Sequence, residues 1–299
     1  MATCIHDSSH KRFFSHNSNK FSALTSPHLI TPTNNSSDQD NEEYIKVWSC
    51  IQEEAQLDSR QEPILSSYYH SSILSHQSLH SALSTLIASK LTTTTLPTAP
   101  LQELFYATLV SDARIMGSVV ADITTVKQRD PVCVSMTHCV LNFKGFHALV
   151  AHRIAHKLWS QNRVSLALLI QSRASEVFAV DIHPAARIGR GVMLDHGTGV
   201  VIGETAVVGS HVVIMHGVTL GGTGKESGDR HPKIGDGVLV GAGSCLLGPI
   251  WIGKGAKIGA GSVVLVREVL PGTTVVGNPG RVIEGQNCPK KLDVVTETT

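Results

Sequence analysis

The sequence of 299 residues is poor in charged and aromatic side chains. Charged residues make up 16% of it and aromatic residues 5%, and the formal net charge is +1. A net charge so close to zero provides no strong field for nucleic acid or for an anionic membrane, so neither is an expected partner. Hydrophobic residues still reach 41%, which excludes a chain that is disordered throughout and is enough for a sizeable core.

Long apolar runs are also missing. The longest are residues 166–170 and 263–266, far short of the ~18 residues that a membrane-spanning helix needs. The sequence therefore predicts no membrane-embedded segment.

The six cysteines form no C-x-x-C pair, and their spacing is irregular. They are Cys4, Cys50, Cys133, Cys139, Cys245 and Cys288. This pattern favours free thiols in a reducing compartment over a disulfide framework or a zinc site.

The two ends of the chain differ from its centre. Residues 1–40 are rich in Ser, His, Asn and Thr and show no hydrophobic period, which predicts a disordered arm. Its few basic residues leave a plastid or mitochondrial transit peptide as an alternative. Because no amphipathic helix is visible there, we favour a plain extension and a cytoplasmic protein. Residues 284–299 are predicted to form a short flexible tail.

Residues 41–180 are predicted to form an all-helical domain. Apolar residues recur there at steps of three and four, as in the run from Tyr44 to Ala55 and again over residues 146–159. Further helices are expected within 73–91, over 101–116 and over 164–177. Breaks are expected at Pro63, at 92–100 and at Asp130-Pro131.

Residues 181–283 follow a period of six instead. The repeated position is always Ile, Val or Leu, with a two-residue slip after Leu194 and an eight-residue insertion after Leu220. The predicted core positions are Ile182, Ile188, Leu194, Ile202, Val208, Ile214, Leu220, Ile234, Val240, Leu246, Ile252, Ile258, Val264, Leu270 and Val276. A six-residue period is typical of a parallel β-helix, with three hexads to each triangular coil. The fold class is therefore α+β, a helical domain followed by a β-helix.

The coil register predicts which distant residues share a face. His196, His216, Ala242 and Ala260 each follow a core position by two residues, so they should form one outward column with a narrow groove above the histidines. Asp181 ends up on the same side one coil below, where its carboxylate can approach the imidazole of His196.

The insertion, residues 221–233, reads GGTGKESGDRHPK. Because the coil does not need it, this loop is expected to be functional, with Arg230 and His231 holding a small carboxylate. The alternative is a solvated surface loop. His211 and His216 lie on different hexads without a third partner in register, so no metal site is predicted.

Several segments closely resemble serine O-acetyltransferases. They are VDIHPAARIGRGVMLDHGTG (180–199), GVTLGGTGK (217–225), GDRHPKIGDG (228–237) and GAKIGAGSVV (255–264), together with RDP (129–131) and LNFKGFHALVAHRIAHKLW (141–159). The resemblance covers residues 41–283, and the style of the N-terminal arm is similar to the plant branch. It implies a left-handed β-helix and transfer of acetyl from acetyl-CoA to the hydroxyl of L-serine, giving O-acetyl-L-serine for cysteine biosynthesis.

The resemblance also implies roles for individual residues. It makes His196 the general base and Asp181 the carboxylate that holds its ring. It places Asp130, Asp195, Arg230 and His231 on the amino acid, and Gly222, Thr223, Ala242 and Ala260 along acetyl-CoA. An imidazole with a pKa near ~6.5 can take the hydroxyl proton during attack on the thioester, so no bound cofactor and no covalent intermediate are needed.

The resemblance implies partners as well. Relatives form homotrimers with sites between neighbouring subunits, and their helical domains pair trimers into hexamers. L-cysteine is expected as a feedback inhibitor. Relatives bind O-acetylserine sulfhydrylase through a C-terminus that commonly ends in isoleucine, whereas this chain ends in Thr299, so that complex is not expected. Two alternatives remain open: an acetyltransferase for another hydroxylated small molecule, and a catalytically weak assembly subunit.

Overall fold

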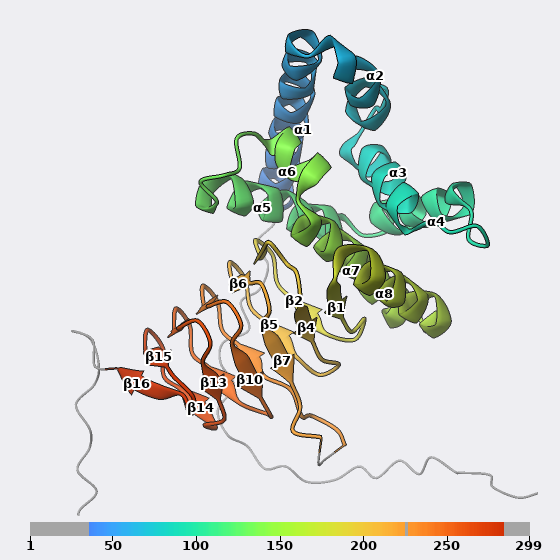
Figure 1. Cartoon of the computed structure of the whole chain (residues 1–299). Helices are drawn as coiled ribbons and strands as arrows, with labels where there is room; N and C mark the ends of the chain where they lie inside the picture. Colours follow the sequence, from blue (N-terminus) through green and yellow to red (C-terminus); the bar gives the residue numbers. More distant parts are fainter. Residues whose placement is uncertain (1–35, 225–226, 284–299) are drawn as a thin grey trace, which may run out of the picture.

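The computed structural model describes residues 36–224 and 227–283. The arm up to residue 35, Lys225, Glu226 and the tail 284–299 lie outside the described residues. Helices gather at one end of a column of short strands (Figure 1). The α-helices are α1 Ser36–Gln61, α2 Ser66–Tyr69, α3 Leu79–Leu91, α4 Thr98–Val110, α5 Ala113–Arg129, α6 Met136–Asn142, α7 Lys144–Ser160 and α8 Val164–Phe178, with short turns η1 Pro63–Leu65 and η2 His70–Leu74.

The helical domain differs from the sequence prediction in two boundaries. Helix α1 begins at Ser36, earlier than residue 41. The single helix predicted over 101–116 is wrong, because α4 ends at Val110 and the carboxylate of Asp112 caps α5 by accepting the Arg114 N–H at 3.1 Å. An N-cap side chain that satisfies a free N–H favours a new helix start at this point.

A search of the described helices for membrane spans found none long and apolar enough to cross a bilayer singly. Only α4 and α5 together meet the length and composition test, and they are bent by 96°.

The strands form three sheets that run along the column. Sheet 1 has the order β1-β4-β7-β10-β13, sheet 2 β14-β11-β8-β5-β2, and sheet 3 β16-β15-β12-β9-β6-β3. The strands are β1 Val180–Ile182, β2 Arg187–Ile188, β3 Met193–Asp195, β4 Val200–Ile202, β5 Val207–Val208, β6 Val213–Met215, β7 Thr219–Gly221, β8 Lys233–Ile234, β9 Leu239–Val240, β10 Cys245–Leu247, β11 Trp251–Ile252, β12 Lys257–Ile258, β13 Val263–Val264, β14 Glu268–Val269, β15 Thr274–Val276 and β16 Arg281–Ile283. Every third strand pairs in parallel, which is the arrangement of a β-helix, and among the strands of the described residues only β16 pairs antiparallel.

The hexad register is confirmed from Ile182 to Val264. The first core column, for example, stacks Ile182 on Ile202 and Ile202 on Leu220. The last two predicted core positions are wrong, since Val269 and Val275 occupy the column instead of Leu270 and Val276. The step from Val264 to Val269 is one residue shorter than a hexad, so Leu270 lies 48% exposed while Val269 is buried.

The helical domain is fixed to the first coil by close packing and by hydrogen bonds from a buried ion pair that joins α5 to α7. Gly145 at the start of α7 lies so near β3 that a Cβ there would come within 2.1 Å of the Leu194 carbonyl oxygen. The Arg153 guanidinium contacts the Asp122 carboxylate at 2.7 Å and donates to the Gly189 carbonyl at 2.8 Å. Burial raises the pKa of Asp122 to about 6, although Arg153 opposes this shift. These contacts hold the helices against the β-helix and so position the groups described next.

Candidate active site

His196 lies in the turn that leads from β3 to β4. Its φ is +55°, in the left-handed region, and Gly197 follows with φ +70°. The Gly197 N–H donates to the Asp195 carbonyl oxygen at 2.7 Å, which closes the turn tightly. The imidazole therefore points outward with 73% of its side chain exposed, and its Nε2 is 3.8 Å from the Asp195 carboxylate.

A cleft of about 800 Å³ opens in front of this imidazole, between the helical domain and the first two coils. Its walls include three predicted site residues: Asp130 from the end of α5, Asp195 and His196. The other lining residues are Val132, His138, Asn142, Phe143, Lys144, Gly145, Leu194, Thr198 and His216. The cleft thus joins two carboxylates to an exposed imidazole.

The position of Asp130 follows from the end of α5. Its N–H donates to the Val126 carbonyl at 2.9 Å, and its carboxylate accepts the Val132 N–H at 2.9 Å. One carboxylate oxygen is held by the turn, and the side chain faces the cleft.

Lys144 is a lining residue that the sequence analysis missed as a site residue. Its ammonium group donates to the Thr198 hydroxyl, linking the start of α7 to the turn after His196. The signal is the LNFKGF segment around the start of α7, which carries part of the family resemblance but gave Lys144 no role of its own.

The predicted outward column is confirmed. Strand register stacks β3 on β6 and β6 on β9, and the rings of His196 and His216 lie edge to face with centroids 5.7 Å apart. Gly243 N–H donates to the His216 carbonyl, and Gly261 N–H donates to the Ala242 carbonyl. We call this line of turns, which carries His196, His216, Ala242 and Ala260, the histidine edge.

Arg230 and His231 lie on a different edge of the coil from His196. They belong to the edge between sheets 1 and 2, which we call the loop edge and which comprises residues 203–205, 221–224 and 227–232. The Arg230 guanidinium contacts the Glu204 carboxylate at 3.1 Å. His231 Nδ1 accepts the Thr205 N–H at 3.1 Å, so the ring carries its proton on Nε2. Burial and then the Arg230 charge lower the pKa of His231, which keeps the ring neutral.

The residues expected along acetyl-CoA divide between the same two edges. Ala242 and Ala260 belong to the histidine edge, whereas Gly222 packs against the Arg230 side chain and Thr223 against Gly248 on the loop edge. Within one chain, the residues assigned to serine and those assigned to acetyl-CoA are therefore both divided between the histidine edge and the loop edge.

Asp181 lies in β1, between these two edges. Its carboxylate accepts a hydrogen bond from Gln171 Nε2 at 2.7 Å. Within residues 36–224 and 227–283, no hydrogen bond joins Asp181 to His196, so their pairing stays a prediction.

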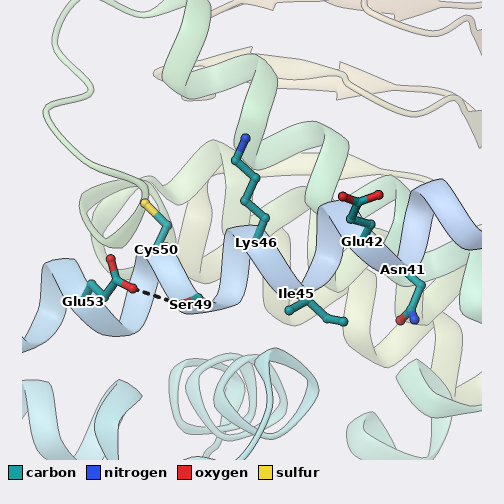
Figure 2. A pocket seen from close by; sticks show the side chains of 7 residues that line it. All are labelled: Asn41, Glu42, Ile45, Lys46, Ser49, Cys50 and Glu53. Atoms are coloured by element: carbon teal, nitrogen blue, oxygen red, sulfur yellow. Dashed lines mark hydrogen bonds between the residues drawn. The ribbon is translucent and has the colours of Figure 1, made fainter.

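A second hollow, of about 670 Å³, follows one face of α1 (Figure 2). All its lining residues come from this helix, among them Cys50 and Glu53, whose carboxylate accepts the Ser49 hydroxyl at 3.1 Å. It contains neither a histidine nor a second element, so it offers no equivalent of the cleft. The described part of the chain also contains no group of three potential metal ligands.

Two family models match the chain. The serine acetyltransferase N-terminal model covers residues 47–151, and the bacterial transferase hexapeptide model (six repeats) covers residues 231–265. The helical domain and the coil are therefore recognised separately.

Curated plant proteins match over most of the chain. It is 61% identical over 249 residues to the chloroplastic serine acetyltransferase 1 of Arabidopsis thaliana, covering 83% of this chain and 79% of the relative. It is 56% identical over 253 residues to the mitochondrial serine acetyltransferase 3 of the same plant, covering 85% of this chain and 64% of the relative's length.

Solved structures agree with these matches. Soybean serine acetyltransferase complexed with serine is 57% identical, with a TM-score of 0.79 over 81% of this chain and 99% of that one. A serine acetyltransferase in complex with cysteine is 49% identical, with a TM-score of 0.79 over 80% and 99%. The predicted fold, a helical domain followed by a left-handed β-helix, is confirmed by the hexapeptide match and these structures. The chain belongs to the serine acetyltransferase family.

Proposed function

We propose that this chain transfers the acetyl group of acetyl-CoA to the hydroxyl of L-serine, giving O-acetyl-L-serine and CoA. The observation that carries the proposal is the cleft, in which Asp130, Asp195 and His196 meet. The named relatives, including one whose structure is complexed with serine, support the substrate.

In the proposed reaction, His196 takes the serine hydroxyl proton while the oxygen attacks the thioester carbonyl. The tetrahedral intermediate collapses by breaking the C–S bond, and the imidazolium returns the proton to the departing CoA thiolate. A carboxylate beside such a ring fixes its tautomer and stabilises the imidazolium, which is the role proposed for Asp181. Direct attack requires neither a metal nor a covalent enzyme intermediate.

Charge explains the proposed roles of the serine-binding residues. The ammonium group of serine is attracted by two carboxylates, those of Asp130 and Asp195, which line the cleft. The serine carboxylate needs a cation, and Arg230 can bind it bidentately beside His231.

The division of the site residues between two edges supports a threefold assembly. In a trimer of parallel coils, the histidine edge of one copy can face the loop edge of the next. This contact would bring together the residues assigned to serine and those assigned to acetyl-CoA. Acetyl-CoA then follows the small residues Ala242 and Ala260, with Gly222 and Thr223 opposite. We propose that the helical domains pair such trimers into hexamers.

L-cysteine has the same ammonium and carboxylate groups as serine, with a thiol in place of the hydroxyl. We therefore propose that it competes for this site, which the structure of a relative in complex with cysteine supports. We propose a cytoplasmic location, with a plastid or a mitochondrion as the alternative because two of the relatives are chloroplastic and mitochondrial. A fluorescent fusion of the full chain distinguishes the two.

The decisive assay is release of CoA thiol from acetyl-CoA by the purified full chain, with and without L-serine. We expect serine-dependent release that decreases when L-cysteine is added. The two alternatives predict other outcomes: an acetyltransferase for another hydroxylated compound would release thiol with sugars but not with serine, and an assembly subunit would release none. Either outcome from a folded oligomer would overturn the proposal.

A further inference from the structure

Asp181 is half-buried and lies in the first strand of the coil. Strand β1 is the end strand of sheet 1, so only β4 pairs with it in register, through Asp181 and Val201. Val180 and Ile182 on either side are buried in the core, which turns the Asp181 carboxylate outward. Among the described strands, no coil precedes β1, so none holds this side chain in one orientation.

Helix α8 provides the contact that orients the Asp181 side chain. It ends at Phe178, and Ala179 adopts a left-handed conformation with φ +55°, which turns the chain directly into β1. This places Gln171 beside β1, where its Nε2 donates to Asp181 Oδ1 at 2.7 Å. Because a carboxylate only accepts hydrogen bonds, the amide must present its NH₂ group here. Within the described residues, this carboxylate has no hydrogen-bond partner other than Gln171.

The turn that carries His196 packs against the same strand. Gly199 N–H donates to the Ala179 carbonyl at 2.7 Å, and a Cβ on Gly197 would lie 3.2 Å from the Val180 side chain. The backbone just before Asp181 thus supports the backbone just after His196. An oriented carboxylate in β1 is therefore well placed to act on the imidazole.

The chemistry of the donor suits this task. Anchoring Oδ1 stops rotation of the carboxylate and leaves Oδ2 for a second partner. An amide donor adds no charge, so the negative charge of Asp181 stays available to stabilise an imidazolium, whereas a lysine or arginine would neutralise it.

We propose that Gln171 is a positioning residue for acetyl transfer, which acts by holding Asp181 in the orientation that supports His196. This inference rests on the proposed function, in which Asp181 and His196 work as a dyad. Gln171 belongs to the helical domain, so it gives that domain a direct part in the chemistry of the coil.

The test is a double-mutant cycle with Gln171→Met and Asp181→Asn in the full chain. Methionine keeps the length of glutamine without the donor. We expect Gln171→Met to lower kcat about tenfold, to leave KM for serine and acetyl-CoA nearly unchanged, and to have no further effect in the Asp181→Asn background. Gln102→Met, at a half-buried glutamine of α4, is the matched control and should keep full kcat.

A second variant gives a readout that a purely structural role would not change. In Gln171→Glu two carboxylates face each other, and one of them can donate only when protonated. We therefore expect its kcat relative to wild type to rise as pH falls. A ratio that does not vary with pH overturns the proposal, even if Gln171→Met fails to fold.

The cycle separates failure of the proposal from failure of the dyad. Full kcat in Gln171→Met, or an equal loss with and without Asp181→Asn, overturns the role of Gln171 alone. Full kcat in Asp181→Asn overturns the dyad, and the role of Gln171 with it. Absence of serine-dependent thiol release in the wild-type chain overturns the proposed function itself.

Discussion

His196 and His211 share an unusual backbone conformation on different edges of the β-helix. Their φ angles are +55° and +57°, and Asn is among the few residues that tolerate this region. His196→Asn removes the base without adding backbone strain, so we expect kcat to fall about 10²–10⁴-fold with an unchanged melting temperature. His211→Asn carries the same substitution away from the cleft and should keep full activity. An active His196→Asn enzyme would exclude the imidazole as the base.

A buried histidine makes stability depend on pH. Burial lowers the pKa of His147 to about 4, and the Val140 carbonyl accepts a hydrogen bond from its Nε2 at 2.7 Å. Below pH ~6.5 this histidine is protonated in the unfolded chain but stays neutral in the folded chain. The free energy of unfolding therefore falls as pH decreases towards about 4, by roughly 3 kcal/mol at most from this group.

Urea unfolding at neutral pH and at about pH 5 measures this dependence. His147→Gln should make it less steep, because glutamine does not titrate, while buried His152, whose pKa burial also lowers, still contributes. His70→Gln, at an exposed histidine, should leave the dependence unchanged. An equally steep decrease in His147→Gln would show that other groups cause it.

At the scale of elements, the contact between α7 and β3 determines whether the cleft forms. A Cβ on Gly145 would lie 2.1 Å from the Leu194 carbonyl oxygen, whereas one on Gly117 in α5 would be 3.5 Å from its nearest neighbour, Asp40. Gly145→Ala must therefore push α7 away from β3. Displacing site groups by about 1 Å can cost about 10²-fold in rate, so we expect a large loss of kcat/KM for serine and a lower melting temperature.

The matched control for this prediction is Gly117→Ala. Alanine favours a helix interior over glycine by up to about 1 kcal/mol, so this variant should be active and slightly more stable. Full activity in Gly145→Ala would mean that the helical domain does not shape the site.

How far the sequence predicts these elements depends on the regularity of their pattern. The coil was predictable because core burial imposes one aliphatic residue per hexad, and the stacking of His196 on His216 followed from counting. The count failed after Val264, since nothing in a run of valines and leucines marks a step one residue short. The break between α4 and α5 was missed because a single capping carboxylate, that of Asp112, outweighs a continuous apolar period.

The candidate site was only partly predictable for a different reason. Periodicity places residues along one element, so it brought His196 together with the rest of its column, whereas Asp195 came from the family resemblance alone. It carries no information on how separate elements dock, so it could not find the Lys144 contact or the Gln171 hydrogen bond. The count does assign the loop after Leu220 to a different corner from that of His196, but it could not show that Arg230 contacts Glu204 there.

At the scale of the whole molecule, the separation of the two edges predicts that sites are shared between copies. His196→Asn disables the histidine edge, and Arg230→Gln disables the loop edge. In mixed trimers of these two variants, about one quarter of the sites combine an intact histidine edge with an intact loop edge from the neighbouring copy. Co-refolding two inactive proteins should therefore restore up to about a quarter of wild-type activity per site.

The control mixture combines His196→Asn with Asp195→Asn, which both disable the histidine edge. No neighbour can then supply an intact one, so we expect no recovery beyond that of the separate proteins. Thiol release by the two mixtures, measured on oligomers of equal size, compares shared sites with sites confined to one chain. If the first mixture recovers no more activity than the second, then Arg230 reaches the cleft within its own chain or does not act on serine.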